Sequence, residues 1–199
     1  MKLIAESTLL EDMKILSEGK GSNKRMYITG PFLQAVKENR NGRIYPQTVM
    51  DGAVNKYKEE YIDKKRALGE LNHPAEPVVN PERAAIMTES LEKNDIYYVG
   101  KAKVLSTPMG KIVESLVNDG CTVGVSSRGL GSLKPTREGY NEVQGDFILT
   151  TAADIVFDPS AQTSFVEGLD IERNKLLHAK KSNLNEVKLN MFNKFLRDL

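Results

Sequence analysis

The chain has 199 residues, enough for one domain whose core is held by burial alone. Its 28 Lys and Arg nearly balance its 27 Asp and Glu, which argues against a module that binds nucleic acid or another polyanion. No apolar run reaches the ~20 residues that span a bilayer, and no signal-peptide pattern begins the chain, so we expect a cytoplasmic protein. The single cysteine, Cys121, excludes an internal disulfide, and its place at the start of an apolar run favours a buried side chain.

The N-terminal part of the chain predicts one strand and one helix. Residues 1–22 mix short apolar runs with charges, and we expect a flexible segment or, at most, a short strand at 13–16. Residues 25–29 alternate and carry strand-forming side chains, which predicts a strand. After a loop at 39–43, Pro46 begins a helix whose apolar face follows i, i+4, i+8 spacing. That face consists of Val49, Ala53 and Tyr57.

The middle of the chain predicts a hairpin followed by a second helix. Residues 84–91 and 96–104 are apolar segments separated by a polar turn, which is typical of two paired strands. Thr107 can cap a helix that has Pro108 in its first turn and Gly120 at its end. The predicted apolar face of this helix consists of Ile112, Leu116 and Val117.

Further strands and a terminal helix complete the predicted fold. A short buried strand at 122–127 leads into a hairpin, in which residues 138–143 return into a strand at 147–156. Residues 184–199 have apolar side chains at helical spacing. Because strands follow strands instead of alternating with helices, the fold class is α+β with a largely antiparallel sheet.

Histidine is scarce, and this limits the candidates for an imidazole base to His73 and His178. Pro74 biases His73 away from helix, and a stiff loop can hold an imidazole in one orientation, as a general base requires. A partly buried histidine at a strand end fits the same pattern. His178 lies in a polar stretch, where we expect it to be solvated.

Residues 124–131 (GVSSRGLG) place two serines, an arginine and glycines directly after an apolar strand. A Ser126 hydroxyl at a strand end can reach into a cleft, and Gly129 allows close approach of backbone or substrate. Arg128 could hold a water or oppose negative charge that develops on a carbonyl oxygen. A polar strand end that turns into a hairpin fits equally well. The spacing matches neither a P-loop nor a G-x-S-x-G elbow.

Asp154 lies inside the apolar run 149–156, where an acid is costly unless it is paired. A histidine is one natural partner, since the acid would fix its tautomer. A position on the solvent face of the strand is the other interpretation. One cysteine and two distant histidines provide no zinc-ligand spacing, so we expect no metal and no cofactor.

Three sequence blocks, in this order and separation, resemble the prohead core proteases of T-even-type phages: NRNGRIYP at 39–46, ALGELNHP at 67–74 and GVSSRGLGSL at 124–133. That family is related in fold to the herpesvirus assemblins. The resemblance therefore implies a mostly antiparallel, β-barrel-like sheet surrounded by helices. It implies a serine protease domain at 23–170, between the segment 1–22 and a polar linker with a C-terminal helix at 171–199.

The resemblance also implies a function and a set of site residues. The family's serine endopeptidases cleave scaffolding-core proteins and the major capsid protein precursor inside the prohead, in the host bacterial cytoplasm. Ser126 would be the nucleophile, His73 its base and Asp154 the acid that orients the base. The residues that would support the oxyanion are Ser127, Arg128 and Gly129. Neither nucleic acid nor membrane is implied as a partner, and a homo-oligomer is left open.

The family cleaves after Ile or Leu, any residue, and then Glu, and this chain contains six such triplets. Four of them fall near the two ends, where proteolysis concentrates, so we expect self-cleavage of both terminal segments. The triplets occupy residues 4–6, 9–11, 16–18, 68–70, 112–114 and 184–186.

Two other functions stay open at this stage. A non-catalytic assembly protein of the same fold would bind the scaffold, and its mark would be a disrupted Ser, His and Asp set. All three positions are filled in this chain. A different serine hydrolase, such as an esterase, would require a small-molecule pocket and a βαβ pattern, and the sequence indicates neither.

Overall fold

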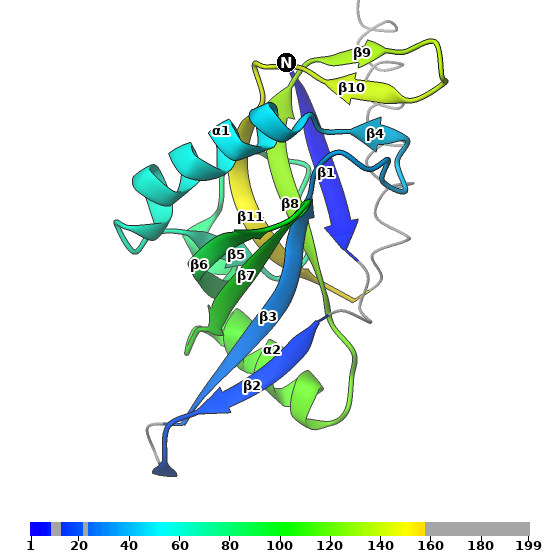
Figure 1. Ribbon diagram of the computed structural model, residues 1–199. Helices are drawn as coiled ribbons and strands as arrows, with labels where there is room; N and C mark the ends of the chain where they lie inside the picture. The colour runs from blue at the N-terminus through cyan, green and yellow to red at the C-terminus, as the bar shows by residue number, and fades with distance from the viewer. Residues whose placement is uncertain (9–12, 22–23, 158–199) are drawn as a thin grey trace, which may run out of the picture. The chain divides into compact units, whose positions relative to one another are not determined.

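The computed structural model describes residues 1–8, 13–21 and 24–157 (Figure 1). The predicted helix at 184–199, the linker before it and His178 lie outside the described residues. The described strands form three sheets in which nearly all neighbours are antiparallel, accompanied by two α-helices in that part of the chain. The mixed α+β architecture is therefore the predicted one.

The largest sheet is built around the predicted central hairpin. Its order is β2 (Lys14–Glu18), β3 (Arg25–Gln34), β7 (Tyr97–Val104), β6 (Ala84–Asn94) and β5 (Leu68–Glu70). All neighbours in this sheet are antiparallel. The hairpin of β6 and β7 turns at Asp95, whose left-handed φ of 56° is one that Asp tolerates better than most residues. The predicted strand and hairpin are both confirmed, although β3 is longer than predicted.

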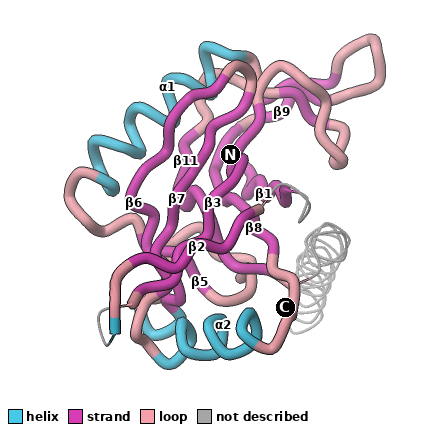
Figure 2. The backbone as a smooth tube through the Cα atoms, turned by 60° about the horizontal axis from the view of Figure 1, so that its bottom comes forward, coloured by secondary structure: helices cyan, strands magenta, loops and turns pink. Residues whose placement is uncertain are grey.

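A second sheet places the predicted buried strand between two partners. Its order is β1 (Lys2–Thr8), β8 (Gly124–Gly131) and β11 (Ile148–Val156), all antiparallel, and Figures 1 and 2 show β8 between the other two. The range 1–22, expected to be flexible, thus holds the strands β1 and β2. Ile4 gives the reason for β1, because its side chain is 2 % exposed and joins the core.

A third, small sheet lies beside β1 and consists of β4 (Arg43–Ile44), β10 (Asn141–Val143) and β9 (Leu133–Pro135). β10 pairs with β9 in an antiparallel hairpin and with β4 in parallel. This sheet matters for the site because it fixes the end of the loop at 39–43, as the Asn141 N–H donates to the Gly42 carbonyl at 2.8 Å.

The sheets do not close into a barrel within the described residues. The two larger sheets meet at one seam, where Leu71, directly after β5, forms a parallel bridge with Ile155 of β11. Gly69 permits this approach, because a Cβ there would collide with the carbonyl of Ala153. No ladder joins β1 to β2 or β3 in the described part of the chain. The barrel-like closure that the resemblance implies is therefore absent there, and the arrangement is open.

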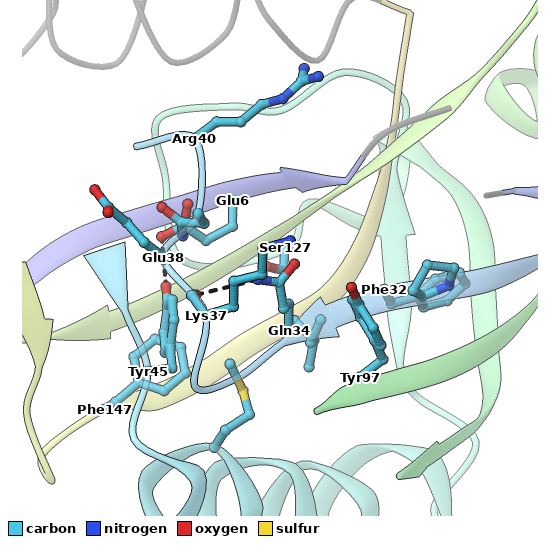
Figure 3. Close-up of a pocket in the computed structure, with 14 residues that line it drawn as sticks. Glu6, Phe32, Gln34, Lys37, Glu38, Arg40, Tyr45, Tyr97, Ser127 and Phe147 are labelled. Carbon is cyan, nitrogen blue, oxygen red and sulfur yellow. Dashed lines mark hydrogen bonds between the residues drawn. The ribbon is translucent and has the colours of Figure 1, made fainter. Parts of the chain in front are cut away.

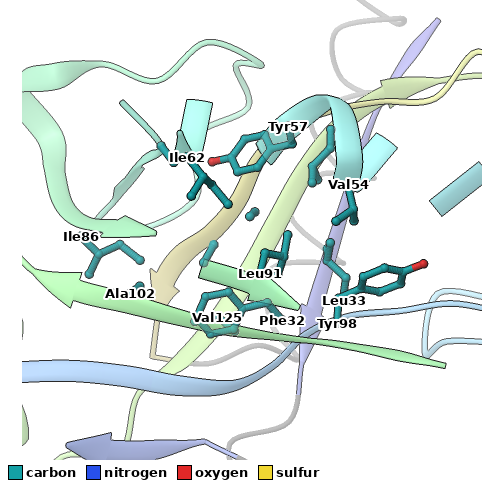
Figure 4. Close-up of a cluster of buried hydrophobic side chains, with 14 of the residues drawn as sticks. Phe32, Leu33, Val54, Tyr57, Ile62, Ile86, Leu91, Tyr98, Ala102 and Val125 are labelled. Carbon is teal, nitrogen blue, oxygen red and sulfur yellow. The ribbon is translucent and has the colours of Figure 1, made fainter. Parts of the chain in front are cut away.

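The first helix covers the core between the sheets. α1 (Gln47–Tyr57) follows Pro46 and continues into a π-helical turn, Lys58–Ile62. Two of its three predicted core positions are buried, Ala53 and Tyr57, and Val49 is partly buried. Figure 4 shows the core that these residues join, with side chains from both larger sheets and from α1, namely Phe32, Leu33, Val54, Tyr57, Ile86, Leu91, Ala102 and Val125.

The second helix, α2 (Pro108–Asn118), begins as predicted but faces the sheet differently. The Thr107 hydroxyl oxygen accepts from the Gly110 N–H at 3.2 Å, which is the predicted cap. Ile112 is 43 % exposed, whereas Val113 is fully buried, so the predicted apolar face is wrong at this position. Gly110 sets the rotation of the helix, because only a residue without Cβ can approach the carbonyls of Leu105 and Ala85 so closely.

Cys121 is exposed, so the prediction of a buried thiol is wrong. α2 ends at Asn118, and Gly120, with a left-handed φ of 87°, redirects the chain at the surface. Burial resumes only at Val123, one residue before β8. Cys121 therefore lies two residues before the first buried position of this stretch.

Candidate active site

β8 carries two serines and an arginine through the middle of a sheet. Ser126, Ser127 and Arg128 are 1 %, 4 % and 0 % exposed. Successive side chains of a strand point to opposite faces, so Ser126 and Arg128 share one face and Ser127 lies on the other. Ser126 is in register with Asp154 of β11 and with Ser7 of β1. The two faces of β8 therefore have different polar surroundings.

The loop after β5 brings His73 to the face of β8 that holds Arg128. Burial and then the positive charge of Arg128 lower the pKa of His73, whereas the Ser127 backbone acts on the ring in the opposite direction. These two influences place the ring near the guanidinium of Arg128 and the backbone of Ser127. Asn72 has a left-handed φ of 63°, which turns the chain away from β11 just before His73.

One hydrogen bond orients the imidazole of His73. Its Nδ1 lies 3.0 Å from the carbonyl oxygen of Pro74, and because a carbonyl only accepts, Nδ1 carries the hydrogen. Nε2 then presents a lone pair, and it is buried with no hydrogen-bond partner in the described part of the chain. Because the pKa is lowered, the ring is neutral near pH 7 and Nε2 can accept a proton.

The carboxylate of Asp154 is fully buried and binds Arg128 instead of His73. Nε of Arg128 donates to Oδ2 at 2.6 Å and Nη2 donates to Oδ1 at 3.0 Å, while the Glu70 N–H donates to Oδ1 at 2.8 Å. Burial raises the pKa of Asp154 to about 6, against the opposing effect of Arg128. Among the described residues no hydrogen bond joins Asp154 to His73. The guanidinium of Arg128, on the adjacent strand, offers two parallel donors to the carboxylate. This geometry explains why Asp154 binds Arg128 and not His73.

Glu70 completes a buried ion cluster, and sequence reasoning assigned it no role. Its Oε1 accepts from Nη2 of Arg128 at 3.3 Å and from the Asn80 N–H at 2.8 Å. Nη1 of Arg128 donates to the carbonyl of Glu76 at 2.5 Å, so the loop that carries His73 is tied across the guanidinium. The available signal was an acid within an apolar stretch, the same signal that singled out Asp154.

The opposite face of β8 borders an open cavity of about 430 Å³ (Figure 3). Ser127 lines this cavity together with Glu6 of β1 and Tyr45. Gly129 lies on the same face beneath Phe147, whose ring would collide with a Cβ at this position. Close packing therefore explains this glycine, and its predicted role in supporting an oxyanion stays a prediction.

Within the described ranges no group of three or more His, Cys, Asp and Glu side chains is arranged to hold a metal ion. In the same ranges no helix has both the length and the apolar character needed to cross a membrane.

Comparison with known proteins relates the chain to proteases of bacteriophage capsid assembly. The prohead core protein serine protease family matches residues 2–175. The prohead core protein protease of Enterobacteria phage T4 is 41 % identical over 164 residues, which cover 80 % of this chain and 76 % of that protein. The solved structure of the bacteriophage T4 capsid assembly protease, gp21, matches with a TM-score of 0.73 at 36 % identity. That match covers 79 % of this chain and 98 % of the T4 chain.

The family model describes serine proteases, and the chain shares its fold, at 36 % identity, with a solved protease, so the protein class is a peptidase. The family match spans all three of the sequence blocks and most of the chain. The chain therefore belongs to the prohead core protein serine protease family.

Proposed function

We propose that the chain is the serine endopeptidase of a bacteriophage prohead, with Ser126 as nucleophile and His73 as general base. The observation that carries this proposal is the geometry of the His73 ring, whose Nδ1 lies against the Pro74 carbonyl and whose Nε2 is buried with no hydrogen-bond partner among the described residues. Burial and the charge of Arg128 lower the pKa of this ring, which favours its neutral form. A general base needs this state before the reaction starts. Membership of the family supports the same assignment.

The proposed reaction runs through an acyl-enzyme. Nε2 of His73 takes the proton of the Ser126 hydroxyl while the oxygen attacks the carbonyl carbon of the substrate peptide bond. The imidazolium gives this proton to the leaving amine, and an ester on Ser126 remains. A water, deprotonated by the same Nε2, then hydrolyses the ester and restores the serine. Throughout, the Pro74 carbonyl holds the Nδ1–H, which is the orienting role predicted for an acid.

Asp154 supports the proposed site through Arg128. The guanidinium donates to two buried carboxylates and one backbone carbonyl, and these bonds hold it beside the His73 ring. Because the donors of the guanidinium are bound, we do not assign the oxyanion to it. The proposed donors are backbone N–H groups near Ser127 and Gly129, which must first leave their partners in the sheet. One such donor typically lowers the barrier by ~3 kcal/mol.

The proposed substrates are the scaffolding-core proteins and the major capsid protein precursor, cleaved after Ile or Leu, any residue, and Glu. The relatives are described as a prohead core protein protease and a capsid assembly protease, and these descriptions support substrates within the prohead. The same proposal includes three further points. The chain cleaves its own terminal segments, it acts inside the prohead in the host cytoplasm, and its fold is related to that of herpesvirus proteases.

Co-expression with a scaffold protein that carries an Ile-x-Glu site tests the assignment. The wild type is expected to cleave, and Ser126→Ala and His73→Ala are each expected to lose at least about 10⁴-fold in kcat, because such residues act as a unit. Circular dichroism and Tm should match the wild type. Ser127→Ala is the matched control, since it keeps its backbone N–H and should retain cleavage.

The same experiment can contradict the proposal in two ways. Retained cleavage in Ser126→Ala, with loss in Ser127→Ala, would move the nucleophile by one residue. Binding of the scaffold without cleavage by the wild type would favour the non-catalytic assembly protein.

A further inference from the structure

Glu6 of β1 binds in a pocket formed by the loop that follows β3. The Tyr45 hydroxyl donates to its Oε1 at 2.8 Å, Nη1 of Arg43 donates to the same oxygen at 3.2 Å, and Nδ2 of Asn41 donates to Oε2 at 2.5 Å. The side chains of Glu6 and Arg43 are 15 % and 16 % exposed. Burial and then the charge of Glu6 raise the pKa of Tyr45, so its hydroxyl stays a donor. The pocket thus supplies donors to both oxygens of one carboxylate.

The same loop also binds the backbone of β1. Nδ2 of Asn41 and Nη1 of Arg43 donate to the Ala5 carbonyl at 3.3 and 3.2 Å. The loop is shaped by its own bonds, because Oδ1 of Asn39 accepts from the backbone N–H groups of Asn41 and Arg43, each at 3.0 Å. Gly42 supplies the left-handed φ of 65° that the turn needs. Such a preformed donor set can bind any extended strand that presents a carboxylate at one position.

β1 pairs with the part of β8 that holds both serines. The antiparallel register places Glu6 opposite Ser127 and Ser7 opposite Ser126, so the peptide bond between Glu6 and Ser7 runs alongside the two serines. In the described part of the chain β1 is also an edge strand of its sheet. A peptide can therefore take its place through the same backbone pairing.

The geometry of a strand determines which side chains of β1 are recognised. Residues i and i+2 point to one face, so Ile4 and Glu6 both lie on the Ser127 side and Ala5 lies on the other. Ile4 is 2 % exposed and packs in the hydrophobic core. An apolar subsite thus lies two residues before the carboxylate pocket.

We infer that Asn41, Arg43 and Tyr45 form the pocket that selects a glutamate in the substrate, and that β1 is an internal occupant of the same groove. This inference rests on the proposed function. A substrate strand with an apolar residue two positions before a glutamate competes with β1 for the groove. Glu6 also lines the open cavity, so free space lies beside its carboxylate (Figure 3).

The test uses a fluorescent peptide with the sequence of residues 2–8 and the same peptide with Gln in place of Glu. Tyr45→Phe and Arg43→Gln are each expected to reduce the preference in kcat/KM for the Glu peptide by about tenfold, because each removes a donor to a charged group. Glu6→Gln weakens the internal occupant and is expected to lower KM for the Glu peptide. The control Glu18→Gln, which loses an exposed ion pair on β2, should change neither quantity.

Each arm can overturn one part of the inference. A preference unchanged in both pocket variants overturns the pocket, and Tyr45→Phe keeps the ring that packs on Phe147, so folding does not obscure this result. An unchanged KM in Glu6→Gln overturns the occupancy by β1.

Peptide binding to the Ser126→Ala variant, measured by fluorescence anisotropy, separates recognition from catalysis. Binding that depends on Arg43, without any cleavage by the wild type, contradicts the proposed function and leaves the pocket intact. Cleavage by the wild type with equal rates on the Glu and Gln peptides contradicts the pocket and leaves the proposed function intact.

Discussion

On one face of β8 the carboxylates of Glu70 and Asp154 are fully buried around Arg128, whereas on the other face Glu6 lies at the edge of a cavity. The buried acids receive a guanidinium and backbone N–H groups from a neighbouring strand and loop. Glu6 receives three side-chain donors from one loop and stays partly exposed. The first arrangement is sealed, and water can enter the second.

The contrast shows that the two faces of one strand can differ in role. One face holds a buried ion cluster, and the other holds a partly exposed binding pocket. Removing one partner of a buried ion pair leaves an uncompensated charge and costs about 3–5 kcal/mol. Where water can reach the remaining group it compensates part of the lost charge, so removing one partner costs less than in the sealed cluster. The face with Asp154 is therefore suited to holding the loop of His73 in place. The face with Glu6 is suited to binding and releasing a strand.

Loss of Asp154 is expected to have the largest effect on stability. In Asp154→Ala the Arg128 guanidinium stays buried without its two-point partner, so we expect the free energy of unfolding to fall by about 3–5 kcal/mol. Urea denaturation followed by circular dichroism measures this. Asp146→Ala is the control, since it removes an exposed acid that binds Ser132, and it should change little. Equal losses in the two variants would contradict the special cost of the buried face.

Gly129→Ala tests the face of β8 that holds Ser127, and its expected effect on the free energy of unfolding is intermediate. The added Cβ collides with the ring of Phe147, and overpacking of this kind typically costs about 1–3 kcal/mol. Phe147→Leu in the same chain should recover part of the loss, as a double-mutant cycle of urea midpoints would report. Gly145→Ala is the control, because a Cβ there meets no atom within 4 Å. Strictly additive losses in the double variant would show that the ring is not the cause.

The smallest expected effect is a change in the pH dependence of kcat/KM. Because burial and Arg128 lower the pKa of His73, the acidic limb of kcat/KM should lie below the ordinary histidine value of about 6.5. As pH falls through the lowered pKa, Nε2 becomes protonated and no longer acts as a base. A limb centred above that value would contradict the neutral, buried ring.

The same pKa direction makes a prediction for stability. Since the unfolded chain binds the His73 proton more readily, stability should decrease as pH falls below about 6.5. Asp154 acts with the opposite sign, because its pKa is raised to about 6 and folding favours its protonated form as pH falls. Subtracting the pH profile of His73→Gln from that of the wild type isolates the histidine contribution. A flat difference would contradict the prediction.

Local patterns were enough to predict several elements and part of the site. The hairpin of β6 and β7, the Thr107 cap of α2 and the buried strand β8 depend on alternation, turn residues and capping between residues close together in the chain. Three sequence blocks were enough to indicate the family, which the match over residues 2–175 confirms. The sequence showed that Asp154 needs a partner, but it did not show that this partner is Arg128.

The amino-acid order alone determined the α+β class, the strand that bears Ser126 and the family. Only the tertiary structure decided that Arg128, and not His73, binds the acid on β11, that residues 2–8 form a strand beside β8, and that the loop at 39–45 surrounds the carboxylate of Glu6. The physical reason is that each of these contacts joins residues far apart in the chain. Their free energy depends on strand register and on which face a side chain takes, and neither is encoded within a short segment.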